Sequence, residues 1–209
     1  AEWSFEEKSG STTNDTSGNG NTGTLTGTPT WSSGKIGGGL LFDSSGGDAM
    51  NTTGVTIGST WTISTWTKFP LTTTGGYRTL VRNGSGIHHI LVDSSGLLGT
   101  YNGSFASSGY DVDSLSSGWH YLTSTGSGGA TNFYIDGNLV GASAQQITSS
   151  IKEIGNAGGS QQWGAIDAMR IYNYVRTPSQ IAYDYNRGAP VAHYKLDECQ
   201  GSVVHSSND

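Results

Sequence analysis

The chain has 209 residues, a length that suits a single all-β domain whose core needs neither metals nor disulfides as staples. The formal net charge is −6 and no basic cluster occurs, which argues against nucleic acid and anionic membrane surfaces as partners. No apolar run is long enough to span a bilayer, so we expect no membrane insertion, and the single cysteine, Cys199, excludes a disulfide within the chain.

The first segment of the chain recurs near its end. Residues 1–7 and 192–198 both contain an aromatic residue, a variable position, an apolar residue and two acids, and a Gly-Ser pair follows each copy at the same offset. A repeat at a domain-sized interval is typical of tandem modules. We therefore expect one domain over 1–188, a linker and the first strand of a following repeat over 189–209, and adjacent repeats of the same protein as partners.

The next segment, residues 15–21, has the pattern of a calcium loop. Oxygen-bearing side chains recur at every second position, and a glycine holds the sixth place, where such a loop turns sharply: Asp15, Ser17, Asn19, Gly20 and Asn21. The twelfth place is Thr26 rather than a bidentate Glu, so a further carboxylate would have to come from elsewhere. The alternative is an Asn/Gly turn closed by side-chain hydrogen bonds.

Many short strands follow, separated by Gly, Ser and Asn clusters. In chain order we expect them at 36–43, 61–67, 79–82, 87–92, 97–101, 119–123, 133–135, 139–140 and 165–172. Asp136-Gly137 between apolar runs predicts a type I′ hairpin turn. His88 and His89 are adjacent, so we expect them on opposite faces of their strand, one exposed and one packed.

One helix is predicted late in the chain. Thr177 is the expected N-cap, a proline follows at the first helical position, and Gln180 completes a capping box. Ile181 and Tyr185 share one face, and Gly188 ends the helix. Many short strands with one late helix indicate a β-sandwich of jelly-roll type.

Several aromatic and amide side chains fall in loop-like positions. Sugars bind by stacking on exposed rings, while amides and backbone groups take their hydroxyls. The candidate ligand-binding residues are Tyr77, Tyr101, Asn102, Tyr110, Gln162 and Trp163. The alternative for each ring is ordinary packing at a surface or sheet edge.

Four segments then resemble bacterial laminin-G-like jelly-roll domains of the concanavalin A-like lectin/glucanase superfamily. They are Trp-x-Phe-Glu-Glu at 3–7, Gly-Lys-Ile-Gly-Gly-Gly-Leu-x-Phe-Asp at 34–43, Tyr-Ile-Asp-Gly at 134–137 and Ile-Asp-x-x-Arg-Ile-Tyr-Asn at 166–173. The resemblance covers most of 1–188. It implies an all-β concanavalin A-like jelly-roll β-sandwich of two antiparallel sheets with one short C-terminal helix.

The resemblance also implies extracellular carbohydrate binding or adhesion, often in tandem and often with a structural calcium. It places the strand that contains Asp167 near the N-terminal region. Asp167 is therefore the first choice for the missing calcium carboxylate, with Glu6 or Glu7 as the second choice.

Three functions stay open at this point. The first is a non-catalytic, calcium-stabilised carbohydrate-binding or adhesion module on a bacterial surface, with a glycan or matrix ligand. The second is a structural spacer bead with the same fold. The third is a glycoside hydrolase, which would need two carboxylates that flank a cleft. The sequence disfavours it, because the only acids at alternate positions, Asp111 and Asp113, lie in a segment that resembles a strand end or loop. Convergence of the candidate rings on one groove would favour binding, and scatter would favour spacing.

Overall fold

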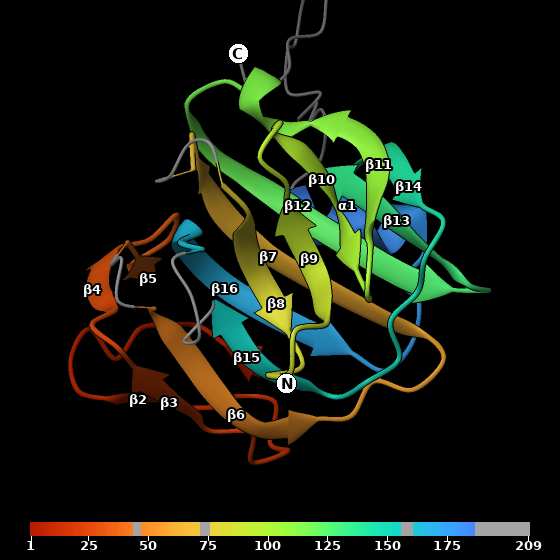
Figure 1. Ribbon diagram of the computed structural model, residues 1–209. Coiled ribbons are helices and arrows are strands. Elements are labelled where there is room, and N and C mark those ends of the chain that lie inside the picture. Colours follow the sequence, from red (N-terminus) through yellow and green to blue (C-terminus); the bar gives the residue numbers. More distant parts are fainter. Residues whose placement is uncertain (44–46, 72–75, 156–160, 187–209) are drawn as a thin grey trace, which may run out of the picture.

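Two antiparallel β-sheets packed face to face form the fold in the computed structural model, which describes residues 1–43, 47–71, 76–155 and 161–186 (Figure 1). The strands are β1 (Glu2–Trp3), β2 (Thr12–Thr13), β3 (Gly23–Thr26), β4 (Thr30–Ser33), β5 (Gly38–Phe42), β6 (Ala49–Val55), β7 (Trp61–Phe69), β8 (Arg78–Arg82), β9 (His88–Val92), β10 (Leu97–Tyr101), β11 (Phe105–Asp111), β12 (Gly118–Ser127), β13 (Ala130–Ile135), β14 (Asn138–Ser143), β15 (Ile151–Gly155) and β16 (Gly164–Tyr172). The predicted β-sandwich is confirmed. The expected linker and repeat strand at 189–209, with Cys199, lie outside the described residues.

The two sheets differ in their position in Figure 1. The front sheet, nearer the viewer, has the order β11-β10-β9-β8-β15-β6-β3-β2. The back sheet has the order β14-β13-β12-β7-β16-β5-β4, and β1 pairs with β16. Apolar side chains from both sheets fill the space between them, among them Trp3, Phe5, Leu40, Phe42, Trp61, Ile63, Leu80, Ile90, Leu98, Phe133, Ile154 and Ile166.

The helix α1 (Pro178–Asn186) covers the outer face of the back sheet. The predicted capping box is present, because the Thr177 N–H donates to Oε1 of Gln180 at 2.9 Å and the Gln180 N–H donates to Oγ1 of Thr177 at 3.3 Å. Ile181 is buried, and the Tyr185 ring lies 5.6 Å from that of Trp66 on β7. No helix formed by the described residues is long and apolar enough to cross a membrane.

The predicted hairpin turn is confirmed, whereas the prediction for His88 and His89 is only partly right. Asp136 and Gly137 have φ values of 51° and 82°, and two positive φ values at the centre of a two-residue turn define type I′. On β9, Arg82 pairs with His88 and Val81 with Ile90, so His89 is the extra residue of a β-bulge. His89 is fully buried, with its ring edge-on to Trp61, and His88 lines a groove on the outer face of the front sheet. His88 is only 7% exposed, so the expectation of one exposed histidine is wrong: the strand packs both rings against neighbouring side chains.

Candidate functional site

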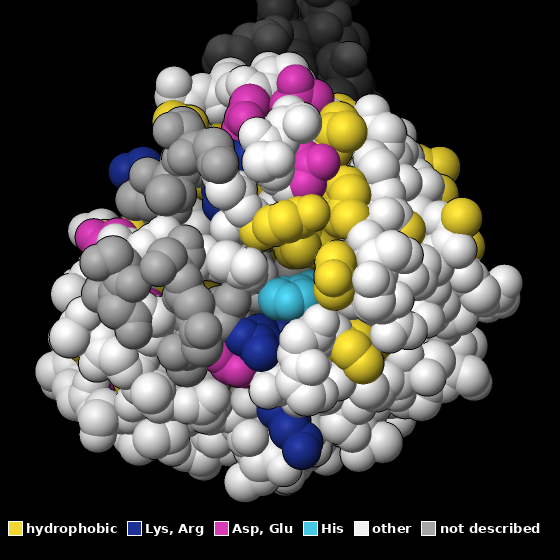
Figure 2. Space-filling view, viewed as in Figure 1, with side chains coloured by type: hydrophobic (Ala, Val, Ile, Leu, Met, Phe, Trp, Pro, Cys, Tyr) yellow, Lys and Arg dark blue, Asp and Glu magenta, His cyan; other side chains and the backbone are white. Residues whose placement is uncertain are grey.

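A groove of about 350 Å³ lies on the outer face of the front sheet. Its lining consists of Tyr77, Gly86, His88, Leu91, Tyr101 and Gln161. Figure 2 shows hydrophobic side chains gathered around a histidine at this hollow. Four of the six lining residues come from strands β9 and β10 or from the turns beside them, so the sheet itself fixes most of the groove.

One wall of the groove is aromatic: Tyr77 and Tyr101 line it, and Phe105 packs against Tyr77. We call these three rings the aromatic wall. The Tyr77 ring centroid lies 6.5 Å from that of Tyr101 and 6.3 Å from that of Phe105, in edge-to-face geometry. Tyr77 is 40% exposed, which leaves ring surface available to a ligand. Phe105 can lie this close because residue 99 is a glycine. A Cβ at this position would come within 2.6 Å of the Phe105 ring.

The floor of the groove is polar. The Thr79 hydroxyl donates to Oε1 of Gln161 at 2.6 Å, and Nδ1 of His88 lies 3.0 Å from the same hydroxyl oxygen. Burial, together with the positive charge of Arg82, lowers the pKa of His88 to about 4, so the ring is neutral at pH 7. Apolar rings above neutral hydrogen-bonding groups are what a sugar-binding surface requires.

Charged residues border the groove in pairs. Arg82 lies 3.6 Å from Glu153, and both side chains are nearly buried. Arg78, which is 1% exposed, donates to Asp113 at 3.0 Å. Both arginines next to the groove therefore have a carboxylate partner.

Asp111 and Asp113, the acid pair considered for glycoside hydrolysis, both make hydrogen bonds that hold the local structure. Asp111 caps a short 3-10 helix by accepting a hydrogen bond from the Asp113 N–H at 2.9 Å. The Asp113 carboxylate is held by Arg78. Both carboxylates approach Gly96, where a Cβ would lie within 2.6 Å of each. These contacts give Asp111 and Asp113 roles in holding the end of β11.

The candidate ligand residues do not all reach the groove. Tyr77 and Tyr101 do. His88 and Gln161 also line the groove and Phe105 contacts Tyr77, although no sequence pattern predicted these three residues. Gln161 lines the groove, whereas the predicted residue, its neighbour Gln162, does not. The one available signal was the Gly-rich approach to residues 161–163, which indicated this loop without indicating which side chain faces outward.

The remaining three candidates lie elsewhere. Trp163 is fully buried and its indole N–H donates to Oγ1 of Thr67 at 2.7 Å, so its ring is not an exposed platform, contrary to expectation. Tyr110 packs against the edge of the core. Asn102 is exposed in the turn between β10 and β11.

The predicted calcium loop folds back on its own carboxylate. Oδ1 of Asp15 accepts hydrogen bonds from the N–H groups of Glu2 and Ser17, and Oδ2 accepts two from the backbone and side chain of Asn21, all at 2.8–2.9 Å. The Asn19 amide donates to the Ser17 hydroxyl at 2.9 Å. Partial burial raises the pKa of Asp15, but these hydrogen bonds outweigh it and hold the pKa well below its usual range.

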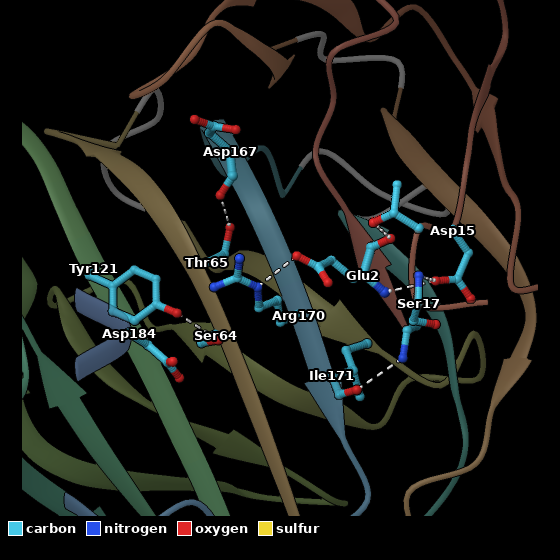
Figure 3. Close-up of polar contacts among 12 residues, drawn as sticks. Glu2, Asp15, Ser17, Ser64, Thr65, Tyr121, Asp167, Arg170, Ile171 and Asp184 are labelled. Carbon is cyan, nitrogen blue, oxygen red and sulfur yellow. Dashed lines mark hydrogen bonds and ion pairs between the residues drawn. The ribbon is translucent and has the colours of Figure 1, made fainter. Parts of the chain in front are cut away.

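Asp167 does not join this loop. Figure 3 shows Glu2, Asp15 and Ser17 grouped on one side of β16, with Asp167 toward the other end of the strand, next to Thr65. The Asp167 carboxylate instead accepts a hydrogen bond from the Ile36 N–H at 2.9 Å, and burial raises its pKa. The second choice, Glu6, accepts from the Gly38 N–H at 3.1 Å, and Glu7 accepts from that of Asn14 at 2.7 Å.

The described residues therefore do not fit a calcium site at this loop. Four N–H donors occupy the acceptor positions of Asp15, and a carboxylate offers about four. Within the described ranges, no group of three or more His, Cys, Asp or Glu side chains is placed to hold a metal ion. The geometry is that of the alternative considered from the sequence, a turn closed by side-chain hydrogen bonds.

Comparison with known proteins places this fold among relatives. A family model described as the concanavalin A-like lectin/glucanases superfamily matches residues 43–182. Domain 4 of a GH43 extracellular arabinanase from Geobacillus stearothermophilus, solved in complex with arabinotriose, is similar, with a TM-score of 0.66 and 22% identity over 88% of this chain and 96% of that one. Comparison with curated proteins gives no match.

Two further structures are similar over most of this chain. The receptor-binding domain of botulinum neurotoxin C/D mosaic serotype has a TM-score of 0.66 and 17% identity over 92% of this chain and 52% of that one. Trypanosoma rangeli sialidase, in complex with the inhibitor DANA, has a TM-score of 0.63 and 16% identity over 88% of this chain and 32% of that one. The chain thus spans about half of the toxin domain and a third of the sialidase.

Proposed function

The chain belongs to the concanavalin A-like lectin/glucanase superfamily, and from this premise we propose that it is a non-catalytic carbohydrate-binding module whose ligand site is the groove on the front sheet. The observation that carries the proposal is the convergence of the aromatic wall on a neutral, hydrogen-bonding floor. The similarity to an arabinanase domain that was solved with arabinotriose supports an oligosaccharide as the ligand.

We also propose that the module acts outside the cell, in adhesion or in attachment to a glycan-bearing surface or matrix. The similar arabinanase is described as extracellular, and the similar toxin domain as receptor-binding. A shallow groove of this kind binds weakly on its own, and adjacent repeats would raise the avidity without any new contact.

A spacer bead is the second candidate, because only two of the four predicted rings reach the groove. Tyr110 packs against the core and Trp163 is buried, and this is the scatter expected of a spacer. His88 lines the groove in addition to the two tyrosines, and Phe105 supports the Tyr77 ring, which is why binding is the better supported function.

A glycan array followed by calorimetry on the best ligand tests the proposal. We expect Tyr77→Ala and Tyr101→Ala each to weaken binding about tenfold or more, since each removes a ring of the aromatic wall. Tyr183→Ala is the matched control, because Tyr183 is 62% exposed on α1, on the other sheet. No binding by the intact chain, or equal losses in all three variants, would favour the spacer.

A further inference from the structure

The polar floor of the groove determines how a ligand is recognised. We infer that Thr79 and Gln161 hold His88 in a single tautomer, so that Nε2 of His88 accepts a hydrogen bond from a hydroxyl of an uncharged sugar. This inference rests on the proposed carbohydrate-binding function, and it adds a specificity-determining residue and a ligand class to it.

The tautomer follows from counting hydrogens in the chain of contacts. The Thr79 hydroxyl has one hydrogen, and Oε1 of Gln161, 2.6 Å away, is an acceptor only, so that hydrogen is directed to Gln161. The Thr79 oxygen can then only accept from His88, and Nδ1, at 3.0 Å, must carry the proton. In a neutral imidazole the other nitrogen, Nε2, is then an acceptor.

The Nε2 atom of His88 is available to a ligand. It has no hydrogen-bond partner within the described part of the chain, and it is not among the side-chain polar atoms that are fully buried without a partner. His88 itself lines the groove, with its ring 5.8 Å from that of Tyr101 and perpendicular to it. A hydroxyl of a sugar stacked on the aromatic wall is the donor that this position requires.

The charges around the groove favour an uncharged sugar. None of its six lining residues is charged at neutral pH, since His88 is neutral. The neighbouring cations Arg82 and Arg78 already pair with Glu153 and Asp113. A sugar carboxylate or sulfate would lose its water without gaining an unpaired arginine beside the groove.

Nitrogen NMR of the histidine side chains tests the tautomer directly, without any ligand. At pH 7 we expect His88 to show a protonated Nδ1 and an unprotonated Nε2. His89 is an internal reference with the opposite tautomer, because its Nε2 donates to the Ser149 carbonyl at 2.9 Å. A protonated Nε2 in His88 would overturn the inference whether or not a sugar binds.

Binding measurements test the ligand class and the role of Thr79. The probes are arabinotriose, cellotriose and lactose as neutral sugars, and sialyllactose and trigalacturonate as acidic ones. We expect the acidic sugars to bind at least about tenfold more weakly than the best neutral one. Thr79→Val, which removes the hydroxyl and keeps the shape, should weaken neutral-sugar binding about tenfold, whereas Thr79→Ser, which keeps the hydroxyl, should stay within about threefold.

The outcomes separate this inference from the function on which it rests. If the intact chain binds neutral sugars through Tyr77 and Tyr101 but Thr79→Val binds as well as the intact chain, or acidic sugars bind equally tightly, the His88 inference fails and the binding function stands. If no sugar binds, or the tyrosine variants bind normally, the proposed function fails as well. Melting curves and the His89 signals show whether each variant is folded.

Discussion

Asp15 is the residue whose carboxylate organises the N-terminal loop. It accepts four hydrogen bonds that connect β1 to the 15–21 turn. We expect Asp15→Asn to lower the free energy of unfolding by about 1–2 kcal/mol at pH 7, because hydrogen bonds to a charged acceptor are lost. Chemical denaturation followed by Trp fluorescence measures this. Asp43→Asn is the control, since Asp43 is exposed and its carboxylate makes no hydrogen bond or ion pair with the described residues.

The sign of the pH dependence at Asp15 is fixed by its lowered pKa. Its contribution is fully present above the unfolded value of 3.8 and is lost as the pH falls below it. The Asp15→Asn variant should therefore lose less stability than the intact chain on further acidification. An equal loss in both proteins would show that the loop does not depend on this charge.

His88 and His89 predict a second, milder pH dependence. Burial lowers the pKa of each to about 4 in the folded chain, against 6.5 for an unperturbed histidine. Between these values the unfolded chain binds protons that the folded chain does not, so stability falls as the pH falls, by up to about 1.4 kcal/mol per pH unit for each histidine. Urea unfolding across this range measures the slope, and His89→Gln should reduce it by about half. An unchanged slope in that variant would contradict a neutral, buried His89.

Which residues form the groove was only partly predictable at the residue scale. Tyr77 and Tyr101 were identified because rings beside glycines tend to be exposed. Gln161 and Trp163 were not separable, because a loop has no fixed side-chain periodicity and either residue can turn inward. The Thr67 hydroxyl, 96 positions away, is what fixes the Trp163 indole inside, and no local pattern carries that information.

At the scale of elements, the capping box of α1 is the most direct test. We expect Thr177→Ala to cost about 1 kcal/mol and to lower the melting temperature by about 2–4 °C, because the Gln180 N–H loses its acceptor. Ser179→Ala is a matched control, since Ser179 is exposed in the same helical turn and its hydroxyl makes no hydrogen bond to the described residues. Equal effects of the two changes would mean that the cap adds nothing to the packing of Ile181.

The strands with strong alternation or β-branched runs were predictable, and the polar strands were not. Residues 97–101 form a strand as predicted, and 165–172 lie within β16. β11 and β6 escaped prediction because their Ser, Thr, Asn and Gly residues resemble loops. β11 takes its strand conformation from backbone pairing with the adjacent strand β10. β6 takes its conformation from pairing with β3 and with β15, and β15 lies far along the chain.

At the scale of the whole molecule, the decisive ligand-removal experiment is to chelate calcium and measure the melting temperature. We expect chelation to leave the melting temperature unchanged, because the Asp15 oxygens are already occupied by N–H donors. A calcium ion at about a hundred times its dissociation constant would stabilise the fold by about 2.7 kcal/mol and raise the melting temperature by several degrees. A rise on adding calcium that Asp15→Asn abolishes would restore the calcium site that the sequence predicted.

The position of β16 between β7 and β5 also affects how fast the protein acquires its structure. The Thr65 hydroxyl on β7 meets the Asp167 carbonyl on β16 across 102 positions of sequence, so the centre of the back sheet cannot close until nearly all of the chain is present. Pairings this distant make folding slow, from milliseconds to seconds. Until then β7 lacks a neighbour on one side, and the nascent domain exposes a strand edge to other chains in its surroundings.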